Sequence, residues 1–168
     1  MRTAMKVVAL AAVIVGLGGA LSLAEAQLAD CRDYVTGIGT IPSAAGDSFA
    51  AFALAVGYKS PKAPLRGLFT AADPAAGFSV VALNVQTYGG FNCFTTQPCY
   101  DRVFTGDAYV TLPDFSGVRP YYVEVIDDGP STPGQNWIDF NSTGYINIGL
   151  LNHGDISIHN QSTAPGCQ

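Results

Sequence analysis

Within residues 48–58, small and large apolar side chains alternate from Ala51 to Tyr58. Phe52, Leu54, Val56 and Tyr58 occupy every second position, with Ala or Gly between them. Because the side chains of a strand alternate between its two faces, this period of two predicts a β-strand. Both faces are apolar, so we expect a loop or a neighbouring domain to cover the small-residue face as well. A helix is the alternative for an Ala-rich segment, but the flanking glycines favour a strand.

Strand signals dominate the rest of the chain, and no segment shows a sustained helical stripe. Clusters of Gly, Pro, Asn and Asp separate the segments and predict turns between them. About nine strands at this spacing predict an all-β fold, which we interpret as an antiparallel, Ig-like β-sandwich. Besides residues 48–58, the predicted strands are residues 34–41, 65–71, 78–87, 103–111, 121–127, 137–140, 145–150 and 155–159.

Residues 1–26 have the pattern of a secretory signal peptide. A basic start precedes an uncharged run over residues 7–24, and Ala24-Glu25-Ala26 forms a small-x-small cleavage site. We therefore expect residues 27–168 to form one secreted domain, extracellular or in the cell envelope, without membrane insertion after cleavage. A membrane anchor and a lipoprotein modified at Cys31 are the alternatives. The Ala and Gly content of the run argues against the first, and Asp30 argues against the second.

The four cysteines predict a fold held by disulfides. Cys31 lies just after the predicted cleavage site, Cys167 is the penultimate residue, and Cys93 and Cys99 are close together mid-chain. Their spacing favours Cys93–Cys99 and Cys31–Cys167 pairs, which would place the first and last strands side by side. Pairing of Cys31 with Cys93 and of Cys99 with Cys167 stays open.

The chain is acidic, which excludes some functions. Its formal net charge is −5, and removal of the signal peptide, with Arg2, Lys6 and Glu25, makes it −6. Without a cluster of Lys and Arg, a nucleic-acid partner is not expected. Both methionines also leave with the signal peptide, so the mature chain lacks the usual ligand set of a blue-copper site.

Three aspartates form the one candidate metal site. Asp127, Asp128 and Asp139 could supply oxygen ligands for Ca²⁺, the one cofactor we consider. The alternative is structural: Asp127 and Asp128 begin a turn before Gly129, and Asp139 faces solvent. No EF-hand or nonapeptide spacing supports the metal, so the turn is favoured.

No catalytic residue is assigned, because no catalytic motif is present. Glu124 is the single glutamate after the signal peptide, and the sequence does not identify a second carboxylate to pair with it. No nucleophile elbow precedes His153 or His159, so solvated histidines are expected. A small hydrolase of glycosidase type, using Glu124, Asp127, Asp128 or Asp139, is kept as an alternative.

Aromatic residues gather around the Cys93–Cys99 segment. If exposed, their rings would form a contact surface for a sugar or a protein. Core filling is the alternative, but the neighbouring glycines and cysteines indicate a loop. This segment is our first candidate for binding, and the residues are Tyr88, Phe91, Phe94 and Tyr100.

Several strand and turn motifs follow one another in a recognisable order. They are Phe52-Ala-Leu54-Ala-Val56-Gly-Tyr58, Pro64-Leu-Arg-Gly67-Leu-Phe69, Val103-Phe104-Thr105-Gly106, Tyr122-Val-Glu-Val-Ile-Asp127-Asp-Gly129-Pro130 and Trp137-Ile-Asp-Phe140. This order resembles the post-COAP domains of bacterial exported and surface proteins. The resemblance implies an extracellular β-rich module, and it implies no catalytic or binding residue.

Together these features predict a non-enzymatic binding or assembly module. Its partner would be a protein or glycan surface, or another copy of the chain. The small hydrolase and an envelope or filament subunit are the two alternatives, the second because both faces of residues 48–58 are apolar.

Overall fold

The computed structural model describes residues 33–59, 63–90, 100–127 and 136–160, and these contain ten β-strands and no helix. The strands are β1 (Asp33–Pro42), β2 (Phe49–Tyr58), β3 (Arg66–Asp73), β4 (Phe78–Ala82), β5 (Thr87–Gly89), β6 (Asp101–Leu112), β7 (Phe115–Ile126), β8 (Trp137–Ser142), β9 (Tyr145–Leu150) and β10 (His153–Asn160).

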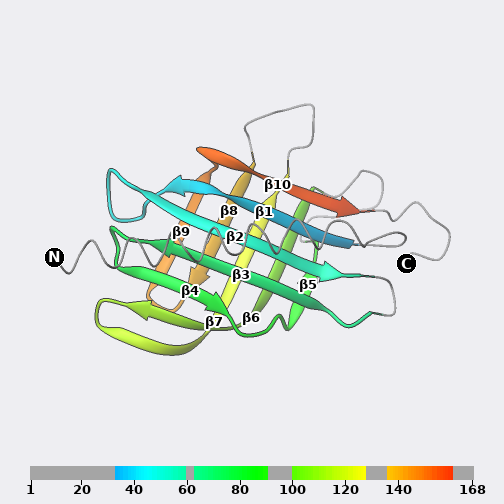
Figure 1. The fold of residues 1–168 in the computed structure, drawn as a ribbon, viewed down its shortest axis with the longest axis horizontal. Helices are drawn as coiled ribbons and strands as arrows, with labels where there is room; N and C mark the ends of the chain where they lie inside the picture. The colour runs from blue at the N-terminus through cyan, green and yellow to red at the C-terminus, as the bar shows by residue number, and fades with distance from the viewer. Residues whose placement is uncertain (1–32, 60–62, 91–99, 128–135, 161–168) are drawn as a thin grey trace.

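All ten strands belong to one antiparallel, hydrogen-bonded sheet. Their order is β10-β1-β2-β3-β4-β6-β7-β8-β9, and the short β5 pairs with β6 beside this path. The sheet curls into a half-barrel, with β10 and β1 to β4 crossing in front of β6 to β9 at a steep angle (Figure 1). The all-β, antiparallel prediction is therefore confirmed, whereas two separate sandwich sheets are not seen among the described residues.

Aromatic side chains join the two halves of the curled sheet. Phe69 of β3 lies 5.9 Å from Phe104 and 6.0 Å from Phe140, between ring centroids. Phe78 of β4 stacks on Tyr145 of β9 at 3.7 Å. Since each pair joins a front strand to a back strand, burial of these rings favours the curled sheet over a flat one.

The predicted strand over residues 78–87 is two strands in the structure. β4 ends at Ala82 and β5 begins at Thr87. Between them the backbone stays beside β6, because the Leu83 amide donates to Asp107 O at 2.8 Å and the Gln86 amide donates to Thr105 O at 2.7 Å. The interruption therefore changes local geometry without changing the order of the strands.

Candidate functional site

The strand β9 forms one end of the sheet and leaves a backbone edge open. Leu151 N donates to Asn136 O at 2.9 Å, which sets the pairing of β8 with β9. In an antiparallel ladder alternate residues face the neighbouring strand, so the odd-numbered residues of β9 face β8. The backbone groups of Ile146, Ile148 and Leu150 point away from it, and no described residue bonds to them.

The same three residues carry exposed apolar side chains. Ile146 is 57% exposed, and Ile148 and Leu150 are each 54% exposed. The alternate residues Tyr145 and Asn147 are buried. Their side chains anchor the strand from within, since Tyr145 OH donates to Asp73 at 2.7 Å and Asn147 Nδ2 donates to Pro42 O at 3.0 Å. We call Ile146, Ile148 and Leu150, with their outward backbone groups, the β9 edge.

A pair of carboxylates lies on the outer face beside the β9 edge. Glu124 of β7 is directly opposite Asp139 of β8, and Asp139 is directly opposite Ile148 of β9. Tyr122 OH donates to Glu124 Oε2 at 2.9 Å. Asp139 Oδ1 is buried without a hydrogen-bond partner among the described residues. The structure thus supplies the partner carboxylate that the sequence does not identify for Glu124.

The surroundings of Asp139 shift the pKa of its carboxyl group. Burial, followed by the charge of Glu124, raises the pKa of Asp139 above its ordinary value. Burial, the hydrogen bond to Glu124 and the neighbouring carboxylates raise the pKa of Tyr122 to about 12. Two carboxyl groups with different environments are the arrangement that acid–base chemistry uses.

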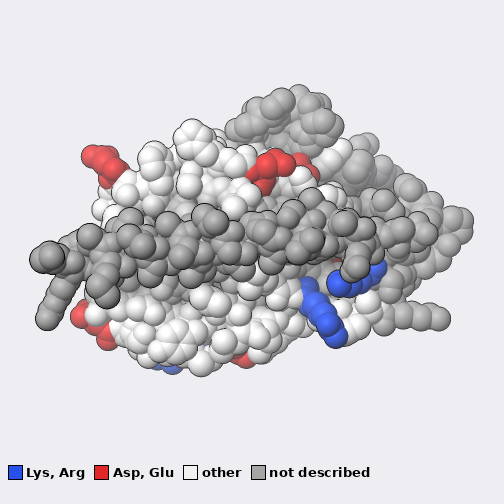
Figure 2. Space-filling model, in the orientation of Figure 1, with Lys and Arg blue, Asp and Glu red and all other residues white. Residues whose placement is uncertain are grey.

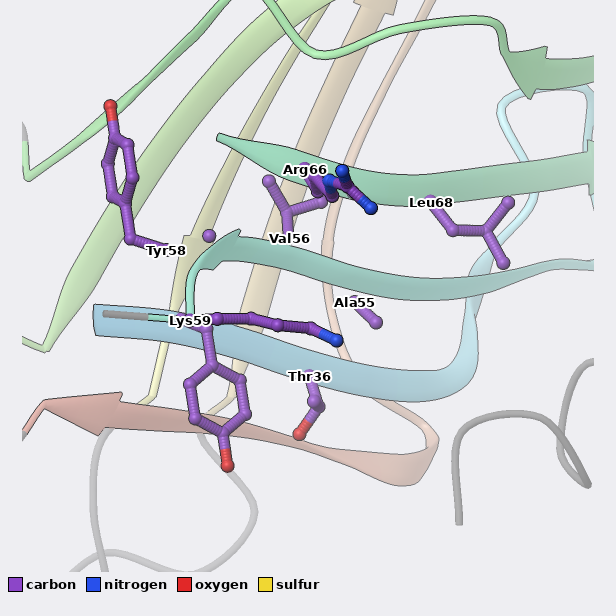
Figure 3. Close-up of a pocket in the computed structure, with 10 residues that line it drawn as sticks. Thr36, Ala55, Val56, Tyr58, Lys59, Arg66 and Leu68 are labelled. Carbon is purple, nitrogen blue, oxygen red and sulfur yellow. The ribbon is translucent and has the colours of Figure 1, made fainter. Parts of the chain in front are cut away.

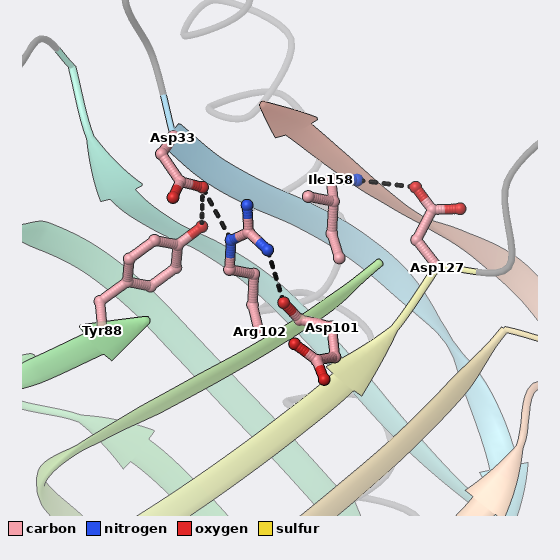
Figure 4. Close-up of polar contacts among 6 residues, drawn as sticks. All are labelled: Asp33, Tyr88, Asp101, Arg102, Asp127 and Ile158. Carbon is pink, nitrogen blue, oxygen red and sulfur yellow. Dashed lines mark hydrogen bonds and ion pairs between the residues drawn. The ribbon is translucent and has the colours of Figure 1, made fainter. Parts of the chain in front are cut away.

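Asp127 protects the other edge strand, β10. Its Oδ2 accepts a hydrogen bond from the Ile158 amide at 2.8 Å (Figure 4). Asp127 therefore caps a backbone amide of β10, whereas Asp139 lies opposite Glu124 on the neighbouring strand. Asp128 is outside the described residues. Within the part of the chain that the structure describes, no group of three or more His, Cys, Asp or Glu is placed to hold a metal, so calcium binding stays a prediction.

Tyr88 is half-buried and is tied into a polar cluster. Tyr88 OH donates to Asp33 Oδ1 at 3.0 Å, and Arg102 Nε donates to the same oxygen at 2.7 Å (Figure 4). The guanidinium carbon of Arg102 lies 6.0 Å from the Tyr88 ring centroid, and Arg102 is only 1% exposed. Burial and the charge of Asp33 raise the pKa of Tyr88. This cluster joins β1, β5 and β6, so Tyr88 has a structural role beside any role in binding.

Of the other predicted contact residues, Tyr100 is 45% exposed. Phe91, Phe94 and all four cysteines, Cys31, Cys93, Cys99 and Cys167, lie outside the described residues. The aromatic surface and the disulfide pairing therefore stay predictions.

The β9 edge is not among the residues predicted from the sequence, although the sequence contains a signal for it. Residues 145–150 alternate between apolar even positions and odd positions that include Tyr145, Asn147 and Gly149. That pattern predicts an apolar face, and the natural assumption is that this face is buried. The structure reverses the assignment, because hydrogen bonds to Asp73 and Pro42 bury the polar side chains of Tyr145 and Asn147.

Comparisons of the chain with models of protein families, with curated proteins and with solved structures found no match. No helix within the described ranges is long and apolar enough to cross a bilayer.

Proposed function

We propose that the protein is a non-enzymatic assembly module whose contact site is the β9 edge. The observation that carries this proposal is that three residues combine side chains more than half exposed with outward backbone groups that bond to no described residue. An open edge strand with apolar side chains is a ready template for an added strand.

The occupant we propose is β9 of a second copy. Two β9 strands paired antiparallel about a twofold axis would satisfy each other's outward amides, and each copy would contribute the same surface. Ile146, Ile148 and Leu150 of the two copies would then form one apolar cluster. A single six-residue strand gives a small interface, so we expect a weak, concentration-dependent dimer with a dissociation constant on the order of 10–100 μM.

Two substitutions at Ile148 separate the backbone and side-chain contributions. Ile148→Pro removes an outward N–H without removing a bond to β8, and proline is tolerated at such edge positions. Ile148→Thr keeps a β-branched side chain and removes apolar area. Sedimentation velocity over a concentration series should show at least about tenfold weaker association for Ile148→Pro and a smaller loss for Ile148→Thr.

Val81→Thr is the matched control. Val81 is 46% exposed on the outer face, but β4 is paired on both sides, with Val81 opposite Thr70 and Tyr109. Its replacement should leave association unchanged. A strict monomer at millimolar concentration, or equal losses for Val81→Thr and Ile148→Thr, would contradict assembly through the β9 edge.

A second candidate function is carboxylate-dependent hydrolysis, of the glycosidase type. It is favoured by the direct opposition of Glu124 and Asp139, with the pKa of Asp139 raised. If the protein is a hydrolase of this type, Asp139 is the proton donor and Glu124 is the second carboxylate. A screen against aryl glycosides tests it: turnover should be abolished by Asp139→Asn and by Glu124→Gln, and retained by Asp127→Asn. Absence of turnover with the unchanged protein would reject this candidate for those substrates.

We also propose that the module is secreted after removal of residues 1–26 and carries Cys31–Cys167 and Cys93–Cys99 disulfides. The export-signal pattern and the cysteine layout support this proposal. The resemblance to post-COAP domains, with an Ig-like sandwich and an aromatic contact loop at residues 88–100, also stays a proposal. N-terminal sequencing of exported protein and peptide mapping without reduction test the cleavage site and the pairing. Any other disulfide pairing would remove the clamp between the two ends of the chain.

A further inference from the structure

A pocket of about 300 Å³ lies over β1, β2 and β3 (Figure 3). Two rows of residues directly opposite one another form it, Tyr34–Gly57–Arg66 and Thr36–Ala55–Leu68. These residues alternate along their strands with the buried core, so they belong to the outer face. The middle member of each row is Gly57 or Ala55, which leaves a hollow between the larger side chains. We call it the β2 trough.

The floor of the trough requires glycine at position 57. Gly57 has a φ of +146°, and a Cβ placed there would lie 2.3 Å from Asp33 O and 2.4 Å from Tyr34 Cα. A larger residue would have to displace the backbone of β1. The small-residue face that the sequence pattern of residues 48–58 predicts therefore becomes a fixed concavity.

Two cationic side chains line this trough in an acidic protein. The chain has 8 Lys and Arg against 13 Asp and Glu. Lys59 and Arg66 are both exposed, and neither has a hydrogen bond or an ion pair to any described residue. In contrast, Arg102 pairs with Asp33, and Arg119 lies 4.1 Å from the Phe115 ring centroid.

The figures agree with this placement of charge. On the face drawn in Figure 2, basic side chains are few and gather mostly at one place, toward the right of the view. Figure 3 shows the Lys59 side chain extended over the same part of the sheet as Arg66, Ala55 and Thr36. Two cations at one trough, neither paired with a described residue, favour an anionic ligand.

The β1 wall of the trough is held in place by β10. The ring of Tyr34 stacks on His159, with centroids 4.3 Å apart and planes at 13°. Thr36 Oγ1 lies 3.0 Å from His159 Nε2. A wall fixed in this way loses little conformational freedom when a ligand binds.

We propose that the β2 trough binds an acidic group carried on a sugar-sized body. Lys59 and Arg66 would contact the acidic group, and Ala55 and Leu68 would contact the body. A bare inorganic anion would leave those apolar residues in water. A long acyl chain needs an enclosed cavity, whereas the trough is open beside the exposed Lys59 and Arg66.

Calorimetric titration of the purified protein with four probes tests this proposal. Glucuronate and glucose 6-phosphate carry a carboxylate and a phosphate on the same ring, glucose has the ring alone, and inorganic phosphate has the charge alone. We expect at least one acidic sugar to bind at least about tenfold more tightly than glucose and inorganic phosphate. The acidic sugar that binds more tightly shows whether the trough prefers a carboxylate or a phosphate.

Three variants test the residues. Arg66→Gln and Lys59→Gln should each weaken binding of that sugar by about tenfold. Ala55→Leu keeps both charges and fills the trough, so it should abolish binding. The matched control is Arg119→Gln, which also removes one charge and should leave binding unchanged. Thermal melts of each variant distinguish loss of binding from loss of folding.

The proposal would be overturned if neither acidic sugar bound, or if inorganic phosphate bound as tightly as the two acidic sugars do. It would also be overturned if Arg119→Gln weakened sugar binding as much as Arg66→Gln does. These results do not depend on the β9 edge, because Ile148→Pro should leave sugar binding unchanged.

Discussion

The two end strands of the sheet differ in what their outward backbone groups meet. On β10, the Ile158 amide donates to Asp127 at 2.8 Å, and Ile156 O accepts from Asn136 Nδ2 at 3.0 Å. On β9, the outward groups of Ile146 and Ile148 meet no described residue. One edge of the sheet is therefore capped by side chains, and the other is open.

The side chains of the same residues also differ in exposure between the two strands. The capped residues of β10 direct their side chains inward, and Ile156 is 1% exposed. The open residues of β9 direct apolar side chains outward. Proteins commonly protect edge strands from pairing with other chains. Protection of β10 and exposure of β9 in one molecule support the proposal that the β9 edge is a contact site for assembly.

The contacts that anchor β9 offer the largest test of this comparison. Asp73 is fully buried and accepts hydrogen bonds from Tyr145 of β9, Ser43 Oγ and the amides of Ala44 and Ala76. Asp73→Ala leaves these donors without an acceptor, so we expect a loss of about 3–5 kcal/mol in the free energy of unfolding. Urea denaturation at pH 7 measures it.

The same anchor has a defined pH dependence. Burial alone would raise the pKa of Asp73, but hydrogen bonds from Tyr145, Ser43, Ala76 and Ala44 outweigh it, and the pKa lies below the ordinary value of 3.8. The stabilisation is therefore complete above pH 3.8 and is lost as the pH falls through the folded-state pKa. Asp73→Asn should cost less in strong acid than at pH 7. Tyr145→Phe, which removes one donor and keeps the ring, is the control. A smaller loss of unfolding free energy for Asp73→Ala than for Tyr145→Phe would show that Asp73 does not anchor β9.

Opening the β10 edge is the second test. Asp127→Ala leaves the Ile158 amide without this acceptor, so we expect a loss of about 1–3 kcal/mol and stronger self-association. Chemical denaturation and sedimentation velocity measure the two effects. Asp114→Ala, an equal change of charge at an exposed turn, is the control. If the Asp127→Ala variant self-associates no more strongly than the Asp114→Ala variant, capping by Asp127 does not explain the difference between the two edges.

The smallest expected effect is at Asp139, beside the open edge. Burial and the charge of Glu124 raise its pKa, so the folded state binds this proton more tightly than the unfolded state does. Stability therefore falls as the pH rises from 3.8 through the folded-state pKa. Asp139→Asn should gain up to about 1 kcal/mol at pH 7 after solvent screening, and nothing below pH 3.

Thermal melts at pH 3 and pH 7 measure that gain. Glu124→Gln should also stabilise the fold at pH 7, because it removes the opposed like charge. A loss of stability for Asp139→Asn at pH 7 would show that its carboxylate is satisfied and would weaken the case for a catalytic pair.

Much of the strand pattern could be predicted because it depends on local chemistry. The predicted strand over residues 145–150 matches β9, and residues 48–58 contain β2. The largest difference is β7, which begins at Phe115, whereas the strand predicted from the sequence begins at residue 121. Pairing with β8 begins only at Tyr121, so Pro120 needs no N–H for a bond on that side.

The candidate site could be predicted less well, because its members meet across strands. Glu124 and Asp139 are 15 positions apart, and the register of β7 with β8 sets them opposite each other. The sequence places Tyr88 in a predicted loop. In the structure its hydroxyl donates a hydrogen bond to Asp33, which is 55 positions away in the chain. Such partners depend on sheet register and curl, which residue types alone do not encode.

By itself, the sequence determined an acidic, all-β chain and the positions of most strands, since period-two patterning and turn residues act over a few positions. It also determined the small-residue face of β2. Only the tertiary structure decided that this face is a cationic trough, that β10 is capped, and that β9 is open. Those features require contacts between residues distant in the chain, such as Asp127 with Ile158, and only the curled sheet brings them together.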